Sequence, residues 1–328
     1  MKKTIAILAG GDSSEYVISV QSADQIKKWL NPEKHKAYIV TIKGKDWEVC
    51  GDDLCNLVIN KDDFSFVQNG QKVKFDCALI AIHGTPGEDG KLQAYFDLIG
   101  LPYTVSNVLS SALTFNKDAT KNYLKATSTT LAKSVIVKKG LAVNVDEITE
   151  KLGLPVFVKP NEAGSSFGIS KVKEKKELLP AIEKAYTENP VVIIEEFIAG
   201  DEITCGLLKT KDKDYILPLT EIVSKKEFFD FDAKYTPSLV DEISPARISD
   251  ELTKKCMAIS SEVYDTLMCK GLVRVDYILR NNDFYFLEIN TIPGMSENSI
   301  VPKMAAAAGI NMRDLFDAII EDCLAQTA

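Results

Sequence analysis

The sequence lacks any apolar run long enough to cross a membrane, which takes roughly 20 consecutive apolar residues. Near its start, Lys2 and Lys3 precede the apolar stretch TIAILA, as in a signal peptide. This stretch is too short for the hydrophobic region of a signal peptide, and it runs directly into Gly10 and Gly11. We therefore expect a cytoplasmic protein that has no membrane partner.

The chain also lacks a disulfide framework. Its seven cysteines are scattered and odd in number, and no two of them form a C-x-x-C pair. This pattern is typical of a reduced, intracellular protein and excludes a small disulfide scaffold. Internal repeats and low-complexity linkers are missing as well.

An excess of positive charge is absent too. The chain has 39 Lys and Arg against 47 Asp and Glu, a formal net charge of −8. This balance argues against a nucleic acid or an anionic membrane as the partner, although it allows local basic sites. A hydrophobic content of 45% and a charged content of 26% are ordinary for a globular protein. Because 328 residues exceed one typical core, we expect two or three domains.

Hydrophobic patterning predicts three α/β regions. In the first, strands at 4–11, 37–42 and 77–82 alternate with helices at 19–30 and 92–100, as in a doubly wound α/β domain. The second begins near Pro102 and has strands at 134–139, 154–160, 170–172 and 191–198, with helices at 146–153 and 176–186. The last third has strands at 203–208, 215–223, 271–279 and 283–290, and helices at 248–269 and 311–326.

Two of the last strands carry polar side chains on one face. In VRVDYIL, Arg274 and Asp276 alternate with apolar residues, and in FLEIN, Glu288 and Asn290 do the same. The two polar faces coincide in an antiparallel hairpin if Asp276 pairs with Glu288. This pairing requires a loop with an odd number of residues, most simply 281–283, because a slip by one residue would turn Asp276 into the core.

Such a pairing brings two carboxylates and an amide oxygen together beside a guanidinium. Oxygen ligands of this kind suit a hard divalent cation, and Mg²⁺ fits if phosphate and water complete its coordination. The competing interpretation is a surface ion-pair cluster of Arg274, Asp276 and Glu288, which contributes little to stability. The strands alone support both interpretations equally.

A loop of small residues, 163–168 (AGSSFG), follows Lys159 at the end of a predicted strand. Small residues allow backbone N–H groups to approach phosphate oxygens, and a lysine adds positive charge. The loop lacks the G-K-[ST] of a P-loop, and an ordinary β-turn explains it better when it is taken alone. The strand VVIIEE ends with Glu195 and Glu196, and Glu202 follows shortly after them; these are acceptors that an adenine amine and ribose hydroxyls need. A solvated acidic loop explains these three equally well.

Further polar residues lie where predicted strands end. Glu15 stands at or near a helix start, where a capping carboxylate is the alternative. His83 belongs to IHGTPGEDG, where a satisfied histidine in a turn is the alternative. Lys234 and Tyr235, in FFDFDAKYTP, fit a plain surface loop as readily as a site.

In this order the motifs resemble the D-alanine–D-alanine ligase family of the ATP-grasp superfamily. The match runs from GGDSSEYVIS through HGTPGEDG, KPNEAGSSFGIS, EEFIAGDEIT, FFDFDAKYTP and RVDYIL to FLEINTIPGMSENSIVP, and so covers most of the chain. The resemblance implies an α/β fold with an N-terminal doubly wound α/β lobe and two ATP-grasp lobes of α+β character, with ATP between them. We place the domains at 1–103, 104–195 and 196–328, the last with the metal site.

The resemblance also implies a two-step reaction that supplies peptidoglycan precursors. The carboxylate of one D-alanine attacks the γ-phosphate of ATP and becomes an acyl phosphate. The amine of a second D-alanine then attacks that carbonyl, and phosphate leaves. Two Mg²⁺ ions, with Mn²⁺ as an alternative, accompany ATP, and a homodimer is expected.

Site roles follow from the same resemblance. Glu15 and His83 hold the first amino acid; Lys117 and Lys159 contact the ATP phosphates, over which the loop with Ser165 and Ser166 folds. Glu195, Glu196 and Ile198 line the adenine, and Glu202 the ribose; Asp276, Glu288 and Asn290 hold the metal ions. The oxyanion is stabilised by Arg274 and the backbone at Gly294. The carboxylate of the second substrate meets Ser299 and Ile300. A hydrogen-bonded set is formed by Glu15, Ser165 and Tyr235.

Other functions remain as alternatives. The Lys234–Tyr235 pair favours an amino acid acceptor, because the relatives that make D-alanyl-D-lactate replace this pair. An ATP-grasp ligase with D-lactate, D-serine or another amino acid as the acceptor is the nearest alternative. A non-catalytic nucleotide-binding regulator is disfavoured because metal, phosphate and oxyanion residues are all present. An oxidoreductase lacks support because no G-x-G-x-x-G follows the first strand.

Overall fold

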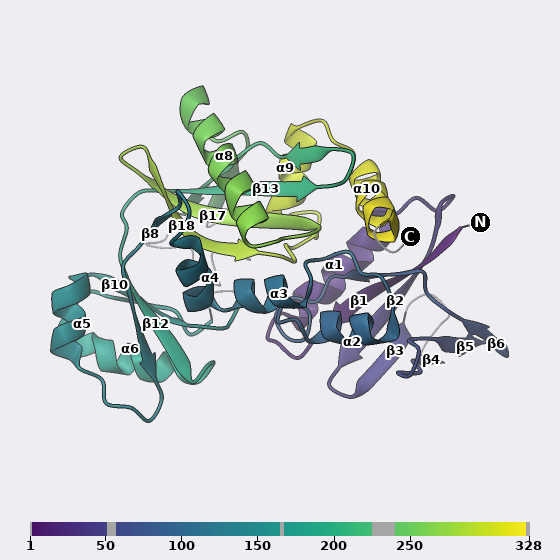
Figure 1. The fold of residues 1–328 in the computed structure, drawn as a ribbon, viewed down its shortest axis with the longest axis horizontal. Helices are drawn as coiled ribbons and strands as arrows, with labels where there is room; N and C mark the ends of the chain where they lie inside the picture. Colours follow the sequence, from purple (N-terminus) through teal and green to yellow (C-terminus); the bar gives the residue numbers. More distant parts are fainter. Residues whose placement is uncertain (1, 51–56, 165–166, 225–239, 326–328) are drawn as a thin grey trace.

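The structure, a computed structural model, describes residues 2–50, 57–164, 167–224 and 240–325. Figure 1 shows three lobes: the purple and blue N-terminal part, a teal part at the lower left, and a green and yellow part above. All three contain both helices and strands, which confirms the predicted α/β class. Within the described residues, no helix combines the length and the apolar character needed to span a bilayer.

The first lobe is built on a five-stranded sheet in the order β4-β3-β2-β1-β7. Strand β1 (Lys3–Gly10) lies between β2 (His35–Lys43) and β7 (Cys77–Ile80) and is parallel to both. Two strands that the sequence patterns missed, β3 (Asp46–Cys50) and β4 (Leu57–Val58), extend the sheet in antiparallel fashion, and β5 (Phe66–Gln68) and β6 (Gln71–Val73) form a separate hairpin.

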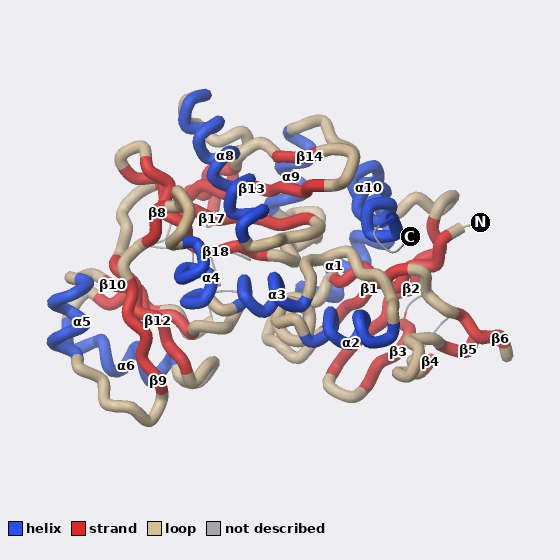
Figure 2. Tube along the Cα trace, viewed as in Figure 1, coloured by secondary structure: helices blue, strands red, loops and turns tan. Residues whose placement is uncertain are grey.

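Helices cover both faces of this sheet, as the doubly wound prediction requires. One face, which carries Ile5 and Ile7, packs against α1 (Tyr16–Trp29) and α10 (Met312–Ala325). The other face packs against α2 (Lys91–Ile99), and Figure 2 shows α10 and α2 on opposite sides of these strands. Because α10 comes from the far end of the sequence, the two ends of the chain share one core.

The lower-left lobe is a four-stranded antiparallel sheet in the order β11-β10-β12-β9. The strands are β9 (Ser134–Lys138), β10 (Val156–Pro160), β11 (Ser170–Val172) and β12 (Val191–Glu196), all four at predicted positions. The amphipathic helices α5 (Val145–Leu152) and α6 (Leu178–Ala185), the second preceded by a 3₁₀ turn η1 (Lys175–Glu177), bury their apolar faces against this sheet.

The third lobe contains a seven-stranded sheet, with a main path in the order β16-β15-β13-β17-β18-β8. Its strands are β13 (Asp201–Lys209), β14 (Asp214–Ile216, paired with β13), β15 (Thr220–Ser224), β16 (Val240–Ile243), β17 (Leu272–Arg280), β18 (Asp283–Asn290) and β8 (Thr130–Leu131). The helices α3 (Val108–Phe115), α4 (Lys117–Leu124) and α8 (Asp250–Thr266) contribute to its core, and α9 (Ile300–Ala307) packs toward the first lobe. The domain limits 1–103, 104–195 and 196–328 stay a prediction, because sheet membership alone does not define a folding unit.

The hairpin between β17 and β18 confirms the predicted pairing of Asp276 with Glu288. The predicted loop 281–283 is wrong, since Arg280 pairs with Asp283 across a two-residue turn. The turn residues Asn281 and Asn282 both have positive φ, at 52° and 66°, a conformation that asparagine tolerates in two-residue hairpins.

A β-bulge restores the register. The pairing shifts between Asp276 and Tyr277, because Asp276 pairs with Glu288 whereas Tyr277 pairs with Phe286. Leu287 is therefore the extra residue, and it lines a cavity beside Glu288 instead of entering the core. One extra residue within a strand changes which side chains share a face. One extra residue in the loop, as we predicted, would have had the same effect.

Among the described residues, three helices were not predicted. The helices α3 and α4 are short, and each begins at an asparagine whose side chain accepts a backbone N–H: Asn107 from Ser110 at 3.0 Å and Asn116 from Ala119 at 2.9 Å. The helix α9 contains Pro302 near its start, where the missing N–H costs little. Pro218 lies in the gap that splits the strand predicted at 215–223 into β14 and β15.

Candidate active site

Two adjoining cavities lie where the three lobes meet. The N-lobe cavity, of about 570 Å³, is lined by residues of the first lobe, of α3, of the loop before β11 and of the large sheet. The inter-sheet cavity, of about 520 Å³, lies between the small sheet and the large sheet. Six residues line both: Lys117, Ala163, Gly164, Arg274, Glu288 and Ile300. The two cavities therefore share a boundary that carries both positive and negative charge.

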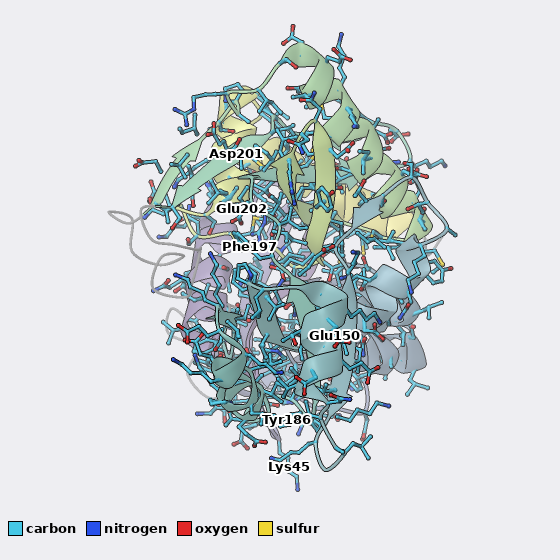
Figure 3. The ribbon with its side chains drawn as sticks, turned by 90° about the vertical axis from the view of Figure 1, so that its left-hand side faces the viewer. Lys45, Glu150, Tyr186, Phe197, Asp201 and Glu202 are labelled. Atoms are coloured by element: carbon cyan, nitrogen blue, oxygen red, sulfur yellow. The ribbon has the colours of Figure 1, made fainter. Side chains whose placement is uncertain are left out.

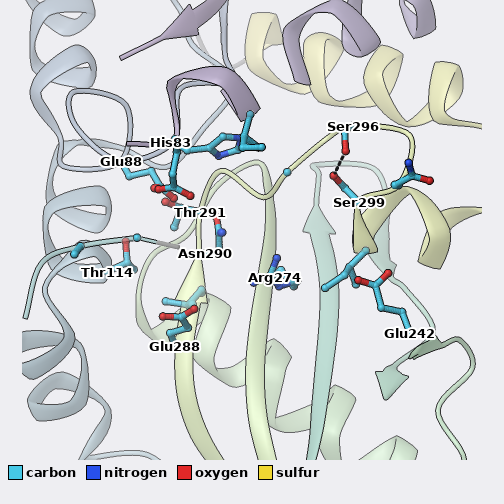
Figure 4. A pocket seen from close by; sticks show the side chains of 18 of the residues that line it. His83, Glu88, Thr114, Glu242, Arg274, Glu288, Asn290, Thr291, Ser296 and Ser299 are labelled. Atoms are coloured by element: carbon cyan, nitrogen blue, oxygen red, sulfur yellow. Dashed lines mark hydrogen bonds between the residues drawn. The ribbon is translucent and has the colours of Figure 1, made fainter. Parts of the chain in front are cut away.

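The polar face of β17 and β18 forms part of this boundary. Arg274 pairs with Asn290 and Asp276 with Glu288, so all four side chains lie on one side of the sheet. Figure 4 shows Arg274, Glu288 and Asn290 reaching into the N-lobe cavity from the same two strands. Asp276 lines the inter-sheet cavity.

Arg274 and Asp276 form a buried ion pair within one strand. Arg274 donates from Nε to Asp276 Oδ1 at 2.8 Å and from Nη2 to Oδ2 at 2.7 Å, and the Thr204 hydroxyl donates to Oδ1 at 2.5 Å. Burial alone would lower the pKa of Arg274, but Asp276 outweighs it and raises the pKa. Each carboxylate oxygen accepts about two bonds, so Oδ2 has room for one further ligand.

Among the described residues, no three His, Cys, Asp or Glu side chains gather around one point. The predicted metal ligands consist of two carboxylates and one amide, and the Asn290 Oδ1 already accepts the N–H of Ile292 at 3.0 Å. A cation at this site would therefore take most of its ligands from bound phosphate and water, as Mg²⁺ commonly does.

Lys159 and Glu195 lie in the wall of the inter-sheet cavity. Lys159 donates to Glu195 Oε2 at 2.8 Å, and Lys121 of α4 donates to Oε1. Burial would raise the pKa of Glu195, but the two lysines hold it at about 2. Burial would lower the pKa of Lys159, yet Glu195 raises it. The carboxylate predicted to meet the adenine is thus bound to two lysines, one of which, Lys121, the sequence patterns did not single out.

The remaining residues predicted for the nucleotide line the same cavity. Glu196, Ile198 and Glu202 all belong to its wall. Figure 3 shows Phe197, Asp201 and Glu202 close together where the lower lobe joins the upper one. The Glu196 carboxylate accepts the backbone N–H of Lys133 at 2.7 Å, which ties the end of β12 to the start of β9.

Lys117 lies at the shared boundary, at the start of α4. Its Nζ donates to the Ala163 carbonyl at 2.8 Å, at the start of the loop of small residues 163–168 (the glycine loop). This contact puts a positive charge beside backbone that is rich in small residues, the arrangement that phosphate-binding loops use.

Glu15 lies in the N-lobe cavity, immediately before α1. It does not cap the helix, because its side chain makes no cap hydrogen bond. A side chain on Gly164 would overlap its Oε2, so only glycine lets the loop approach this carboxylate so closely. Glu15 and the glycine loop are therefore neighbours, although 149 positions separate Glu15 from Gly164.

His83 is buried, and its hydrogen bonds assign its tautomer. Nδ1 donates to the Ile292 carbonyl at 2.9 Å, which leaves Nε2 to accept from the Ser22 hydroxyl at 3.4 Å. Burial lowers the pKa of His83 even though the Glu15 carboxylate is near. The ring is thus a neutral support that links β7 to the segment after β18.

Glu88, from the same HGTPGEDG motif, is a cavity residue that our prediction missed. It lines the N-lobe cavity and lies beside His83 in Figure 4. Burial, followed by the charge of Glu15, raises the pKa of Glu88 to about 8, against the hydrogen bond that it accepts from the Gly84 N–H at 2.6 Å. The sequence signal was present in the quoted motif, but nothing local distinguishes this glutamate from a turn residue.

Gly294 also lines the N-lobe cavity, as do Ser299 and Ile300 at the start of α9. The hydroxyls of Ser296 and Ser299 lie 2.8 Å apart, and Figure 4 marks their hydrogen bond with a dashed line. A helix N-terminus presents unpaired backbone N–H groups and so favours a carboxylate or phosphate. The other predicted site residues, Ser165, Ser166, Lys234 and Tyr235, lie outside the described residues.

Comparisons with known proteins agree on one family. A family model described as the N-terminus of D-ala D-ala ligase matches residues 4–106, and one described as its C-terminus matches residues 126–321. A D-alanine–D-alanine ligase from Parabacteroides distasonis is 51% identical over 323 residues and is covered, like this chain, to 98%.

Solved structures give the same result. A D-Ala:D-Ser ligase from Enterococcus faecalis is 34% identical, with a TM-score of 0.85 over 98% of this chain and 99% of the other. A D-alanine–D-alanine ligase from Bacillus anthracis complexed with ATP is 30% identical, with a TM-score of 0.79 over 99% of this chain and 98% of the other.

Proposed function

This chain belongs to the D-alanine–D-alanine ligase family, and we propose that it uses ATP to join two molecules of D-alanine for peptidoglycan synthesis. The observation that carries the proposal is the boundary shared by the two cavities. A nucleotide in the inter-sheet cavity and an amino acid in the N-lobe cavity would meet beside Glu288, Arg274 and Lys117. Phosphoryl transfer to a carboxylate brings anions together, so it requires positive charge at the point of contact.

In the first step, the carboxylate of the first D-alanine attacks the γ-phosphate, ADP leaves, and an acyl phosphate forms. Glu15 would hold the ammonium group of this D-alanine, while the neutral His83 supports the cavity wall. Lys117 and Lys159 would contact the phosphates, Ile198 and the backbone after Glu195 and Glu196 the adenine, and Glu202 the ribose.

We propose that Asp276, Glu288 and Asn290 hold two Mg²⁺ ions, with Mn²⁺ as an alternative. Their oxygen donors and the open position on Asp276 Oδ2 fit such ions. Bound Mg²⁺ would neutralise phosphate charge and fix the geometry of the transferred group. Arg274 orients Asp276 through its two hydrogen bonds and remains close enough to the boundary to face the reacting carboxylate.

In the second step, the amine of the second D-alanine attacks the carbonyl, the tetrahedral intermediate forms, and phosphate leaves. Arg274 and the backbone at Gly294 would stabilise its oxyanion. Ser299, Ile300 and the N-terminus of α9 would bind the carboxylate of the second D-alanine, since they line the same cavity as Glu15. The roles proposed for Ser165, Ser166, Lys234 and Tyr235 follow the family resemblance.

The choice of acceptor is tested by a competition. Purified protein is incubated at neutral pH with ATP, Mg²⁺, D-alanine and an equal concentration of D-lactate or D-serine. We expect one D-alanyl-D-alanine and one phosphate for each ATP consumed. A predominant ester or D-alanyl-D-serine product would overturn the acceptor, and a chain that turns over no ATP would overturn the ligase assignment itself.

We further propose a cytoplasmic homodimer that contacts through the first lobe. Leu98 of α2, exposed by 87%, supports a contact surface on that face of the first lobe. Light scattering of the purified chain, and of a Leu98→Glu variant, tests this surface, because a charge in a dimer contact should yield monomers.

A further inference from the structure

Lys121 is a buried lysine next to the inter-sheet cavity that does not line it. It is only 5% exposed, and it belongs to neither cavity wall. Its ammonium donates to the Ala132 carbonyl at 2.8 Å and to Glu195 Oε1. A lysine is rarely buried this deeply unless it is paired, so the partners of Lys121 should explain its burial.

The pairing involves a second lysine. The other oxygen of Glu195 accepts from Lys159 at 2.8 Å, and Lys159 does line the cavity. Two ammonium groups thus share one carboxylate, which leaves the group of three with one net positive charge. The three side chains come from α4, β10 and β12, so this charge is set by tertiary contacts.

Without Lys121, the charge of Lys159 would be cancelled. A lone Lys159–Glu195 pair is neutral, and it would present a dipole, not a charge, to an anion in the cavity. With Lys121 present, Glu195 divides its negative charge between two lysines. Lys159 then keeps a net attraction for an anion, and partial burial makes that attraction stronger than it would be in water.

We propose that Lys121 is a positioning residue of the ligase: by neutralising Glu195 from behind, it leaves the charge of Lys159 available to the nucleotide phosphates. The inference rests on the proposed function, because it takes the inter-sheet cavity as the ATP site. It assigns Glu195 mainly to the lysines and only secondarily to the adenine.

A merely structural role makes a different prediction. Ala132, which Lys121 also contacts, lies in the connection between the large sheet and the small sheet. If Lys121 only holds this connection in place, its loss would disturb the whole cavity, and every nucleoside would bind more weakly. If it acts through charge, only ligands with phosphates would lose affinity.

The test compares ADP with adenosine by titration calorimetry in the presence of Mg²⁺. In Lys121→Met, we expect ADP to bind about tenfold to a hundredfold more weakly, the effect of one unit charge several ångströms away at an effective dielectric constant near 20. Adenosine affinity should change by less than about threefold, within the scatter of surface substitutions. Lys125→Met is the matched control, because Lys125 terminates the same helix but is exposed.

Three further variants keep the inference testable if Lys121→Met does not fold. Glu195→Gln removes the negative charge, so the ratio of ADP affinity to adenosine affinity should rise. Lys121→Met combined with Glu195→Gln restores one net positive charge, so the ratio should return to the wild-type value. Lys121→Arg, which keeps the charge, should retain most of the ADP affinity.

The outcomes separate the inference from the proposed function. A wild-type chain that binds no ADP overturns the proposed function and the inference with it. If the wild-type chain binds ADP, equal losses for ADP and adenosine in Lys121→Met overturn the inference alone. An unchanged or lower ratio in Glu195→Gln also overturns the inference alone.

Discussion

Two carboxyl groups, one in each cavity, respond to their surroundings in opposite directions. Burial disfavours the charged form of both Glu88 and Glu195. Glu195 has two lysines in contact, and its pKa falls to about 2. Glu88 has Glu15 nearby, and its pKa rises to about 8. The partners, more than the depth of burial, decide whether a carboxyl in a cavity wall is charged.

The difference suits the ligands that we propose for the two cavities. In the inter-sheet cavity, the charged Glu195 pairs with Lys159, which would meet the phosphates, and with Lys121, which lies outside the cavity wall. In the N-lobe cavity, a protonated Glu88 carries no charge, and Glu15 is the residue that we propose for the ammonium group. Glu288 lies where the cavities meet, so it belongs to both environments.

The largest effect is expected at that shared position. Glu288→Ala removes a proposed metal ligand between the two cavities, and turnover should fall by at least about a thousandfold, the upper range for loss of one preorganised charge-stabilising contact. Phosphate release and dipeptide formation measure the loss. Circular dichroism and the melting temperature should stay close to those of the wild-type chain, because Glu288 is only half-buried. Unchanged turnover at limiting Mg²⁺ would remove Glu288 from the metal site.

A smaller effect is expected where the glycine loop meets Glu15. Gly164→Ala places a methyl group against Oε2 of Glu15, so the loop or the carboxylate must move. We expect kcat/KM for D-alanine to fall by about tenfold to a hundredfold, since a displacement of about 1 Å can cost that much. Initial rates at varied D-alanine measure the effect. A drop confined to KM for ATP would indicate that the loop serves only the nucleotide.

The smallest effect concerns stability, and it tests the opposite behaviour of the two carboxyls directly. Between pH 4.5 and about 8, folded Glu88 holds a proton that the unfolded chain has lost, so its contribution to stability falls as the pH rises. Between pH 4.5 and about 2, the unfolded chain holds a proton that folded Glu195 lacks, so that contribution falls as the pH drops. Melting temperatures of Glu88→Gln and Glu195→Gln against pH measure both.

Compared with the wild-type chain, Glu88→Gln should lose less stability on the alkaline side, and Glu195→Gln should lose less on the acid side. The difference between variant and wild type is the relevant quantity, because Asp317 also has a lowered pKa and contributes to acid sensitivity in every variant. If the melting temperatures of both variants change with pH in parallel with the wild-type chain, the opposite pKa shifts of Glu88 and Glu195 are wrong.

Much of the site could be predicted, because its motifs are local. Arg274 and Asp276 alternate with apolar residues, as do Glu288 and Asn290, and a period of two fixes which side chains share a face. Glu88 was missed because the motif around it is equally compatible with a turn.

The sequence by itself determined where many of the strands run and which of their faces are polar, since periodicity depends only on near neighbours, although it did not reveal β3 and β4. The folded chain alone decided how those faces meet. A bulge at Leu287, not a longer loop, brings Asp276 opposite Glu288. The helix α10, near the C-terminus, packs on one face of the sheet formed by the N-terminal strands. Lys121 reaches Glu195 across 74 positions. Charges in this site are set by such distant partners, and no short stretch of sequence contains both members of the pair.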